Sequence, residues 1–503
     1  MKVKYSRTGA NAVRGMLEMH VELIAQRLLP LLLLFTGALA GAPGDVQARI
    51  AHVESGLLPR YVIDGRPVLK MTLVERMAFY KVPGVGIAVL HNGVIEWAKG
   101  YGVREAGQPA PAGTDTLFQA ASISKPVAAM AALRLVQEGK LSLDEDVNRK
   151  LTTWKVPENE FTTEQKVTLR RMLTHSAGLT VHGFPGYAQG APLPTLVQVL
   201  DGVPPANTAP IRVNVKPGAL NRYSGGGFTL IQQMLIDVTG KPFPDFMQET
   251  VLGPLGMRRS TCQQPLPEAL WRQAASAHDR SGVAIKGRWN TYPEMAAAGL
   301  WTTPSDLARF AIELRNAFHG RSERVLSAAT ARQMLTRQRK DLNGLGIGLG
   351  GEGKTLSFSH GGANRGFMCY LVAFVESGDG AAIMTNGDRG QALIQEVLRG
   401  LSAEYGWPEF RQEKKTAVVA DPKVLQSCAG TYQLDPGNSV LISFESGKLY
   451  WQFRPDGPKT ELFPESATTF FSMADVPAFT FEKDGKDNVV AVRLGTARAA
   501  KIK

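Results

Sequence analysis

The sequence predicts an α+β fold: an antiparallel sheet flanked by helices, a mostly helical subdomain, and a small all-β barrel at the C-terminal end. Three observations lead to this prediction. Apolar runs that are typical of strands lie at 85–100 and again at 355–385. The chain between them is rich in helical patterns, Pro and Gly. Beyond residue 422 the pattern changes to short alternating strands. We expect a functional site between the sheet and the helical subdomain.

The chain of 503 residues is too long for a single hydrophobic core. At the N-terminal end, a cationic lead precedes a short apolar run at 28–42 that contains small residues. This arrangement predicts a secretory signal and a periplasmic or secreted protein. The alternative is an uncleaved segment that anchors the protein to the inner membrane. The predicted division is a signal peptide at 1–40, a main domain at 41–405, a linker at 406–421 and a barrel domain at 422–503.

The first elements of the main domain follow from local patterns. An amphipathic stretch at 67–80 predicts a helix, and two strands at 85–91 and 94–100 should form a hairpin because Asn92-Gly93 joins them. A helix from about 122 to 138 carries apolar residues that predict its burial, and it stops at Gly139.

The later elements follow in the same way. Thr303 and Pro304 predict the start of a helix, as cap and first helical residue. Apolar runs on both sides of the turn 376–380 predict a hairpin, and a last helix should cover 390–404. The strands expected in the barrel are 440–444, 448–453, 469–472, 478–481 and 489–493.

Ser122-Ile123-Ser124-Lys125 forms an S-x-x-K motif where the buried helix begins. One helical turn separates Ser122 from Lys125, so both side chains lie on one face. A serine hydroxyl is a poor nucleophile until a base takes its proton, and a lysine whose pKa is lowered by burial can take it. In isolation the motif is weak, because a helix start with capping serines and a solvated lysine gives the same pattern.

Two further motifs strengthen the prediction of nucleophilic catalysis. Tyr223-Ser224-Gly225 lies on a Gly-rich turn before an apolar helix, where catalytic groups are commonly displayed. His360-Gly361-Gly362 precedes the predicted hairpin, and its glycines would let a substrate lie close to a strand edge. A packing tyrosine and a turn histidine are the alternatives for these two side chains.

In this order the three motifs resemble those of the serine β-lactamase and penicillin-binding superfamily. The group resembled most contains class C β-lactamases, D-alanyl-D-alanine carboxypeptidases, D-aminopeptidases and esterases. The stretches VPGVGIAVLHNGVIEWAKGYG, VTLRRMLTHSAGL, VLGPLGM and AAAGLWTTPSDLARF support the resemblance, which covers roughly residues 60–400. It implies a β-lactamase/transpeptidase-like domain, and some members of the family carry a small appended β-barrel.

The resemblance also implies roles for the motif residues. Ser122 would be the acylated nucleophile, and Lys125 would support its deprotonation. Tyr223 would act as general base and as acid for the leaving group, if a neighbouring cation depresses its pKa. His360 would line the groove and tune this proton traffic, beside Gly361 and Gly362. The backbone N–H groups of Ser122 and Ala363 would form the oxyanion hole.

Gly225 departs from the family pattern. Members that recognise an amide usually have Asn at this position, where its side chain holds the acyl-amide of the substrate. Gly supplies no such group. We therefore expect this chain to be a better esterase than β-lactamase.

The charge pattern excludes one class of partner. The formal net charge is +12, and the basic residues are scattered along the chain. This predicts a solvated basic surface that could associate with an anionic envelope, and not a nucleic-acid site. The predicted partner is a small-molecule or peptide substrate. No cofactor or metal is predicted, and the oligomeric state stays open.

Cysteines and histidines offer no metal-ligand spacing. Cys369 lies in an apolar strand and should be a small buried hydrophobe, while a disulfide between Cys262 and Cys428 is an alternative to free thiols. His175 should make a structural contact at a helix end. A zinc site built from His175, His182 and His360 is a weakly supported alternative.

The sequence therefore predicts an exported serine hydrolase that works through an acyl-enzyme at Ser122 and cleaves esters or D-amino-acid-containing amides. A true class C-like β-lactamase or D-alanyl-D-alanine carboxypeptidase is the alternative within the family. The alternative from another class is a non-catalytic muropeptide-binding protein. The intact Ser122, Lys125 and Tyr223 argue against it.

Overall fold

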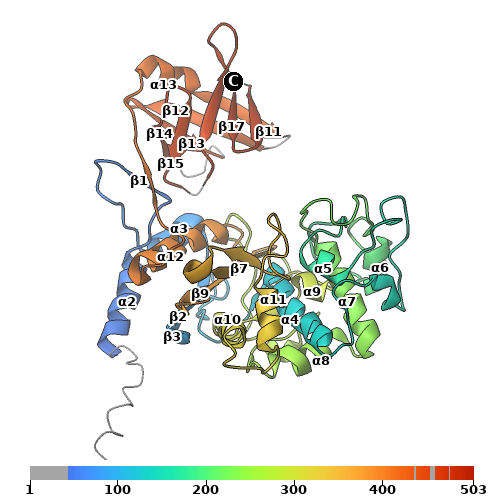
Figure 1. Ribbon diagram of the computed structural model, residues 1–503. Helices are drawn as coiled ribbons and strands as arrows, with labels where there is room; N and C mark the ends of the chain where they lie inside the picture. The colour runs from blue at the N-terminus through green and yellow to red at the C-terminus, as the bar shows by residue number, and fades with distance from the viewer. Residues whose placement is uncertain (1–42, 436–437, 454–458, 475, 503) are drawn as a thin grey trace, which may run out of the picture. The chain divides into compact units, whose positions relative to one another are not determined.

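The computed structural model describes residues 43–435, 438–453, 459–474 and 476–502 (Figure 1). The predicted signal peptide at 1–40 lies outside these residues. The chain divides into two compact units, Met1–Ala51 and His52–Lys503. Of the first unit, only the beginning of helix α2 (Pro43–Ser55) is described. Within the described part of the chain, every helix is too short or too polar to cross a membrane.

A six-stranded sheet in the order β3-β2-β9-β8-β7-β6 forms the centre of the main domain. All neighbouring strands are antiparallel, which confirms the predicted sheet. The strands are β2 (Gly84–His91), β3 (Val94–Gly102), β6 (Gly348–Gly350), β7 (Ser357–Asn364), β8 (Phe367–Phe374) and β9 (Gly380–Thr385). Because β2 pairs with β9, the two ends of the domain meet in one sheet.

Turn chemistry accounts for the predicted hairpin between β2 and β3. Asn92 and Gly93 have φ values of 53° and 79°, and such a pair of left-handed residues matches the twist of the flanking strands. The helix expected at 67–80 is shorter than predicted. Helix α3 (Leu73–Tyr80) begins only after Thr72, whose side chain accepts from the backbone N–H of Glu75 while the Glu75 carboxylate accepts from the Thr72 N–H.

Two long helices cover the sheet, and α3 packs against one of them. Helix α10 (Pro304–Phe318) begins at the predicted Thr303 cap and packs against β2, β3 and β9. Helix α12 (Gly390–Tyr405) packs against β8, β9 and α3. A buried ion pair joins α3 to α12, because Arg76 donates to the carboxylate of Glu396 at 2.7 Å.

The helical subdomain surrounds α4 (Ser124–Gln137), which is buried nearly all round, as predicted. Helix α7 (Gly225–Thr239) and the short helix α9 (Met295–Ala298) pack against α4. The other helices of this region are α5 (Leu169–Leu173), α6 (Leu196–Asp201), α8 (Phe243–Met247) and α11 (Ala328–Met334). Two short strands, β4 (Phe118–Gln119) and β5 (Trp301–Thr302), pair beside the start of α4.

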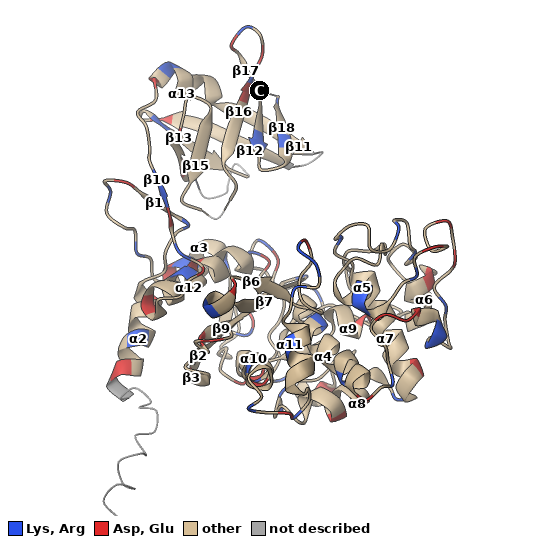
Figure 2. Ribbon diagram, in the orientation of Figure 1, with Lys and Arg blue, Asp and Glu red and all other residues tan. Residues whose placement is uncertain are grey.

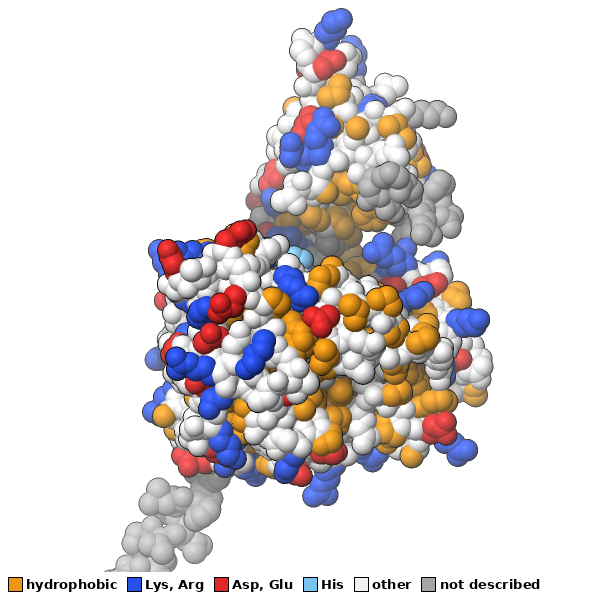
Figure 3. Space-filling view, turned by 90° about the vertical axis from the view of Figure 1, so that its right-hand side faces the viewer, with side chains coloured by type: hydrophobic (Ala, Val, Ile, Leu, Met, Phe, Trp, Pro, Cys, Tyr) orange, Lys and Arg blue, Asp and Glu red, His pale blue; other side chains and the backbone are white. Residues whose placement is uncertain are grey.

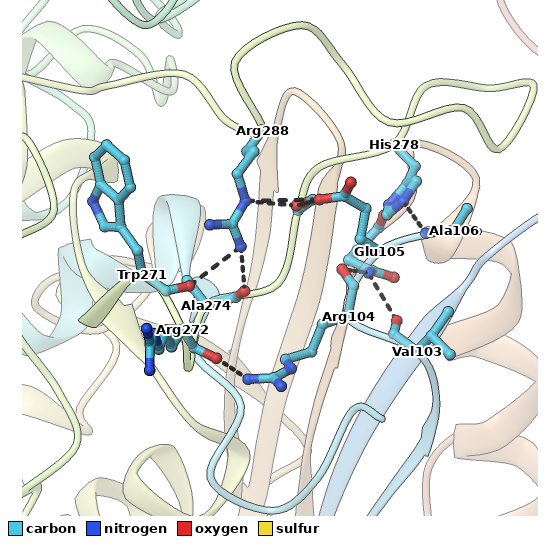
Figure 4. A network of polar contacts seen from close by, with 11 residues as sticks. Val103, Arg104, Glu105, Ala106, Trp271, Arg272, Ala274, His278 and Arg288 are labelled. Atoms are coloured by element: carbon cyan, nitrogen blue, oxygen red, sulfur yellow. Dashed lines mark hydrogen bonds and ion pairs between the residues drawn. The ribbon is translucent and has the colours of Figure 1, made fainter. Parts of the chain in front are cut away.

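Long irregular segments of this subdomain are held by side chains. In the network of Figure 4, the Arg288 guanidinium lies 3.7 Å from the Glu105 carboxylate and donates to the Ser276 hydroxyl at 3.0 Å. The backbone N–H of Ala106 donates to Nε2 of His278 at 3.0 Å. These contacts fasten the loop after residue 271 to the chain that follows β3.

The C-terminal part forms the predicted barrel, closed by eight antiparallel strands. Three strands were not expected from the sequence: β11 (Gly430–Asp435), β14 (Thr460–Pro464) and β18 (Ala497–Lys501). The others are β12 (Asn438–Glu445), β13 (Lys448–Gln452), β15 (Thr469–Ser472), β16 (Phe479–Lys483) and β17 (Val489–Leu494), preceded by helix α13 (Pro422–Cys428). Its interior forms a hydrophobic cluster of its own. In the predicted linker, β10 (Glu413–Lys415) pairs in parallel with β1 (Tyr61–Ile63).

Charged side chains are dispersed over the described elements. Figure 2 shows Lys and Arg on helices and loops throughout, with Asp and Glu among them. On the face shown in Figure 3, basic and acidic groups alternate with apolar and neutral surface. This agrees with a solvated basic surface. All three cysteines are buried and free, so the alternative of a disulfide between Cys262 and Cys428 is wrong, whereas the burial of Cys369 is confirmed.

Candidate active site

Ser122 lies in a strained turn directly before helix α4. The turn is the 3₁₀ segment η1 (Ala121–Ile123), so the α-helix starts at Ser124 and not, as predicted, at Ser122. Ala121 has a φ of 49°, a region that residues other than Gly rarely adopt. The Ser124 hydroxyl donates to the Ala121 carbonyl at 2.6 Å and accepts from the Leu300 N–H at 3.0 Å. These hydrogen bonds hold the turn that presents Ser122.

Strand β7 approaches this turn very closely. A Cβ atom on Gly362 would lie 2.3 Å from the Ala120 carbonyl oxygen and 2.4 Å from Sγ of Cys369, so only glycine fits. The Cys369 thiol donates to the same carbonyl at 2.9 Å. Gly361 differs, because a Cβ there would meet only the Tyr370 ring at an ordinary 3.5 Å. The third motif is therefore packed against the nucleophile turn through its second glycine.

Lys125 is placed to exchange a proton with Ser122. Its Nζ lies 2.9 Å from Oγ of Ser122 and donates to the Ala297 carbonyl at 2.8 Å. The side chain is only 2% exposed, and this burial lowers its pKa to about 7. Near neutral pH a substantial share of Lys125 is then the neutral amine, which can accept the Ser122 proton.

Tyr223 lies beside both groups. Its ring is 5.1 Å from Nζ of Lys125. Burial of the hydroxyl raises its pKa to about 12, although a hydrogen bond with Ser122 lowers it, and the residue as a whole stays 39% exposed. The depressed pKa on which the predicted general-base role depended is therefore not found. At neutral pH Tyr223 is a phenol, which can pass on a proton but does not start as a phenolate.

His360 lies within strand β7, and its ring is 6.4 Å from that of Tyr223. Nδ1 donates to the Gly361 carbonyl at 2.6 Å. Burial, and after it the charge of Lys125, lower the pKa of His360 to about 4. The imidazole is therefore neutral at neutral pH.

The edge of β7 is open beside His360. Strand β6 pairs only with residues 357–359 of β7. Among the described strands, residues 360–363 therefore have a neighbour only on the side of β8. Ala363 is exposed on this edge, and η1 with Ser122 packs against β7. The two segments predicted to supply the oxyanion N–H groups therefore adjoin each other.

The space in front of Gly225 is filled by a neighbouring loop. A Cβ atom there would lie 2.9 Å from the Phe184 ring and 3.0 Å from the His182 carbonyl oxygen. The Gly225 N–H donates to that carbonyl at 3.2 Å. Gly225 is thus the first residue of α7 against which residues 182–184 pack, and it offers no side-chain donor.

His175 joins the site, although its sequence position suggested only a contact at a helix end. Its ring lies 4.3 Å from the Tyr223 ring. The histidine follows α5 and reaches Tyr223 through the fold, so its position relative to Tyr223 could not be read from spacing. The stretch containing it was nevertheless among those that carry the family resemblance.

The zinc site considered as an alternative is not formed. Nδ1 of His182 contacts the Tyr223 carbonyl, and Nδ1 of His175 accepts from the Ser224 N–H at 3.2 Å. In the part of the chain that the structure describes, no group of three potential ligands is arranged to hold a metal ion.

Comparisons with known proteins identify a matching family and several relatives. The family described as Beta-lactamase matches residues 69–401. Penicillin-binding protein 4 of Amycolatopsis lactamdurans is 27% identical over 71% of this chain and 95% of its own length. Esterase EstB of Burkholderia gladioli is 32% identical over 41% of this chain and 53% of its own length.

Solved structures share the fold. The octameric penicillin-binding protein homologue from Pyrococcus abyssi has a TM-score of 0.58 and 23% identity, over 85% of this chain and 98% of its own. D-amino acid amidase from Ochrobactrum anthropi SV3 has a TM-score of 0.55 and 21% identity, over 71% of this chain and 99% of its own.

Proposed function

The chain belongs to the β-lactamase family and is a hydrolase of that superfamily; on this premise we propose that it acts through an acyl-enzyme at Ser122 and prefers ester substrates. The observation that supports the mechanism most is the 2.9 Å contact between Nζ of Lys125 and Oγ of Ser122. Because burial lowers the pKa of Lys125 to about 7, no second base is required to start the reaction.

The proposed reaction has two halves. In the first, neutral Lys125 takes the Ser122 proton while Oγ bonds to the substrate carbonyl carbon. The Ser122 and Ala363 N–H groups stabilise the negative oxygen. The proton taken by Lys125 then passes through the Tyr223 hydroxyl to the leaving alcohol or amine, the scissile bond breaks, and the acyl group stays on Ser122, with Lys125 and Tyr223 both neutral again. In the second half, Lys125 takes a proton from water while the water oxygen bonds to the acyl carbon. The bond between the acyl carbon and Oγ of Ser122 then breaks, Oγ receives the proton from Lys125, and the acid is released.

Gly225 supports esters over β-lactams as substrates. Its position carries no amide donor, and the adjacent space is filled by Phe184 and the His182 carbonyl. A missing hydrogen bond of this kind costs roughly 1–3 kcal/mol. Esters depend less on it because their carbonyl is attacked more easily. The likeness to an esterase is consistent with this preference.

A second candidate function is hydrolysis of D-amino-acid amides or peptides. It is favoured by the likeness to Penicillin-binding protein 4, because the match covers 95% of that relative's length. The D-amino acid amidase structure also shares the fold. Both candidates form an acyl-enzyme at Ser122 and differ in the acyl group and in the bond that is broken, an ester or an amide.

We also propose that the protein is exported to the periplasm or secreted, on the basis of the apolar run at 28–42 and its cationic lead. N-terminal sequencing of protein from fractionated cells tests this. A chain that begins near residue 41 in the periplasmic or secreted fraction supports export, whereas an intact Met1 on membranes supports the anchor.

The proposed chemistry is tested with a substrate panel and a covalent probe. The parent protein should hydrolyse short-chain p-nitrophenyl esters faster than D-alanyl peptides, with little turnover of nitrocefin. A fluorophosphonate probe should label Ser122, as located by mass spectrometry. Ser122→Ala should abolish both labelling and turnover while the circular dichroism spectrum is unchanged. An adduct on another residue, or full activity of Ser122→Ala, would contradict the mechanism.

A further inference from the structure

His175 holds the chain on both sides of Tyr223. Its carbonyl accepts from the Arg222 N–H at 2.7 Å, and its Nδ1 accepts from the Ser224 N–H at 3.2 Å. Its ring lies 4.3 Å from the Tyr223 ring at an interplanar angle of 37°. One residue therefore contacts the backbone before Tyr223, the backbone after it, and the aromatic ring between them.

This arrangement requires a neutral imidazole. Nδ1 can accept the Ser224 N–H only when it carries no proton, so the ring proton lies on Nε2. Burial, followed by the charges of Lys125 and His360, lowers the pKa of His175 to about 3. The acceptor is consequently present throughout the pH range in which the hydrolase is expected to work.

His175 also has a strained backbone. Its φ of 55° lies in the left-handed region, where Asn is tolerated better than most other residues. Such strain persists only where the surroundings over-determine it, and here the two hydrogen bonds to residues 222 and 224 do so. The strained residue and the loop that carries Tyr223 stabilise each other.

We infer that His175 is a positioning residue that fixes the Tyr223 hydroxyl relative to Ser122 by holding the backbone on both sides of Tyr223. The inference rests on the proposed function, because it assigns a role in the same acyl-transfer step. His175 itself does not exchange protons with substrate. A misplacement of about 1 Å at a reacting group can cost about 100-fold in rate, which sets the size of the expected effect.

A double-mutant cycle tests this inference. We expect His175→Ala to lower kcat/KM for a p-nitrophenyl ester by about 100-fold. The rate is expressed per Ser122 that the fluorophosphonate probe labels, so that misfolded protein is not counted. In the Tyr223→Phe background, the same substitution should change the rate by less than about threefold, because the hydroxyl it positions is already absent. Equal effects of His175→Ala in the two backgrounds would overturn the inference.

Rescue by a conservative variant separates positioning from packing. His175→Asn keeps an acceptor for the Ser224 N–H and tolerates the left-handed backbone, so it should stay within about tenfold of the parent. If His175→Ala yields no protein that the fluorophosphonate probe labels, His175→Phe is used in its place. The Phe variant keeps a ring against Tyr223 and removes only the acceptor for the Ser224 N–H. His175→Asn as slow as the acceptor-free variant would also overturn the inference.

His278 provides a matched control. It is buried, and Nε2 accepts the Ala106 N–H at 3.0 Å (Figure 4), so Nε2 carries no proton. Nδ1 donates to the Asn386 carbonyl at 2.7 Å, which makes the ring a neutral imidazole. His278→Asn should lower Tm but leave the rate per titrated Ser122 unchanged. If the rate falls in proportion to the loss of Tm among the variants at both His175 and His278, His175 contributes only to stability, which would overturn the inference. Absence of Ser122 labelling in the parent would instead contradict the proposed function itself.

Discussion

At the scale of single residues, the reaction depends on one desolvated amine. Burial lowers the pKa of Lys125 from 10.5 to about 7, so the neutral form that can accept a proton gains population as the pH rises through 7. We expect kcat/KM for p-nitrophenyl acetate to rise with pH and to level off above an apparent pKa near 7. A pH series from 4 to 9 at constant ionic strength measures it. A rise in kcat/KM with an apparent pKa near 4 would identify His360 as the base instead.

Glu294 is a second buried group with a displaced pKa. Its carboxyl is fully buried, and neither oxygen accepts a hydrogen bond from another described residue. Burial raises its pKa from 4.5 to about 7. Between these values the unfolded chain loses the proton that the folded chain keeps, so the free energy of unfolding falls as the pH rises through this window.

Replacing Glu294 by Gln should remove that dependence. At pH 4 parent and variant should have similar stability, and by pH 7.5 the variant should be more stable by on the order of 3 kcal/mol. Urea unfolding at several pH values measures the difference. A difference between the two proteins that does not change with pH would mean that the carboxyl has an unidentified partner.

The sequence allowed some of these residues to be predicted but not others. Ser122 and Lys125 are one turn apart, so their proximity follows from local geometry alone. The positions of His175 and Phe184 depend on loops that return to the site from other parts of the chain. Their approach to Tyr223 and Gly225 is a tertiary property with no local pattern. The raised pKa of Tyr223 follows from burial, which the motif does not encode.

At the scale of elements, turn and cap residues predicted where elements begin and end better than amphipathic spacing did. The Asn92-Gly93 turn and the Thr303 cap predicted elements that the structure contains. The prediction of a helix at 67–80 is wrong for its first six residues, because amphipathic spacing does not show at which residue the helix is capped. The sequence predicts Ser122 in an α-helix, but the turn before α4 is 3₁₀, because the Ser124 hydroxyl holds it through hydrogen bonds with Ala121 and Leu300.

The contact between α7 and the loop at 182–184 determines what a substitution at Gly225 should do. An Asn side chain would meet the Phe184 ring and the His182 carbonyl within 3.0 Å. We therefore expect Gly225→Asn to destabilise the protein by about 1–3 kcal/mol, as overpacking does, without raising nitrocefin turnover. Thermal unfolding and the ratio of nitrocefin to ester activity test this. A higher ratio with an unchanged Tm would show that the loop moves aside to admit the side chain.

At the scale of the whole molecule, the barrel is a closed sheet with a separate hydrophobic cluster. Removal of residues 422–503 should therefore leave a folded main domain that still acylates Ser122, with lower stability or altered substrate preference. Circular dichroism and fluorophosphonate labelling of the truncated chain test this expectation. A native spectrum without labelling would mean that the barrel helps to form the site.

The close packing of β7 against the nucleophile turn has a consequence for how this motif can diverge. Gly361 and Gly362 are adjacent and chemically identical, yet a Cβ meets ordinary contact at the first and a backbone oxygen at 2.3 Å at the second. Random mutation should therefore yield viable descendants at 361 and almost none at 362. A library built on this motif should therefore randomise 361 and keep 362 fixed. The same asymmetry makes position 361 the one at which relatives can exchange a glycine for a larger residue.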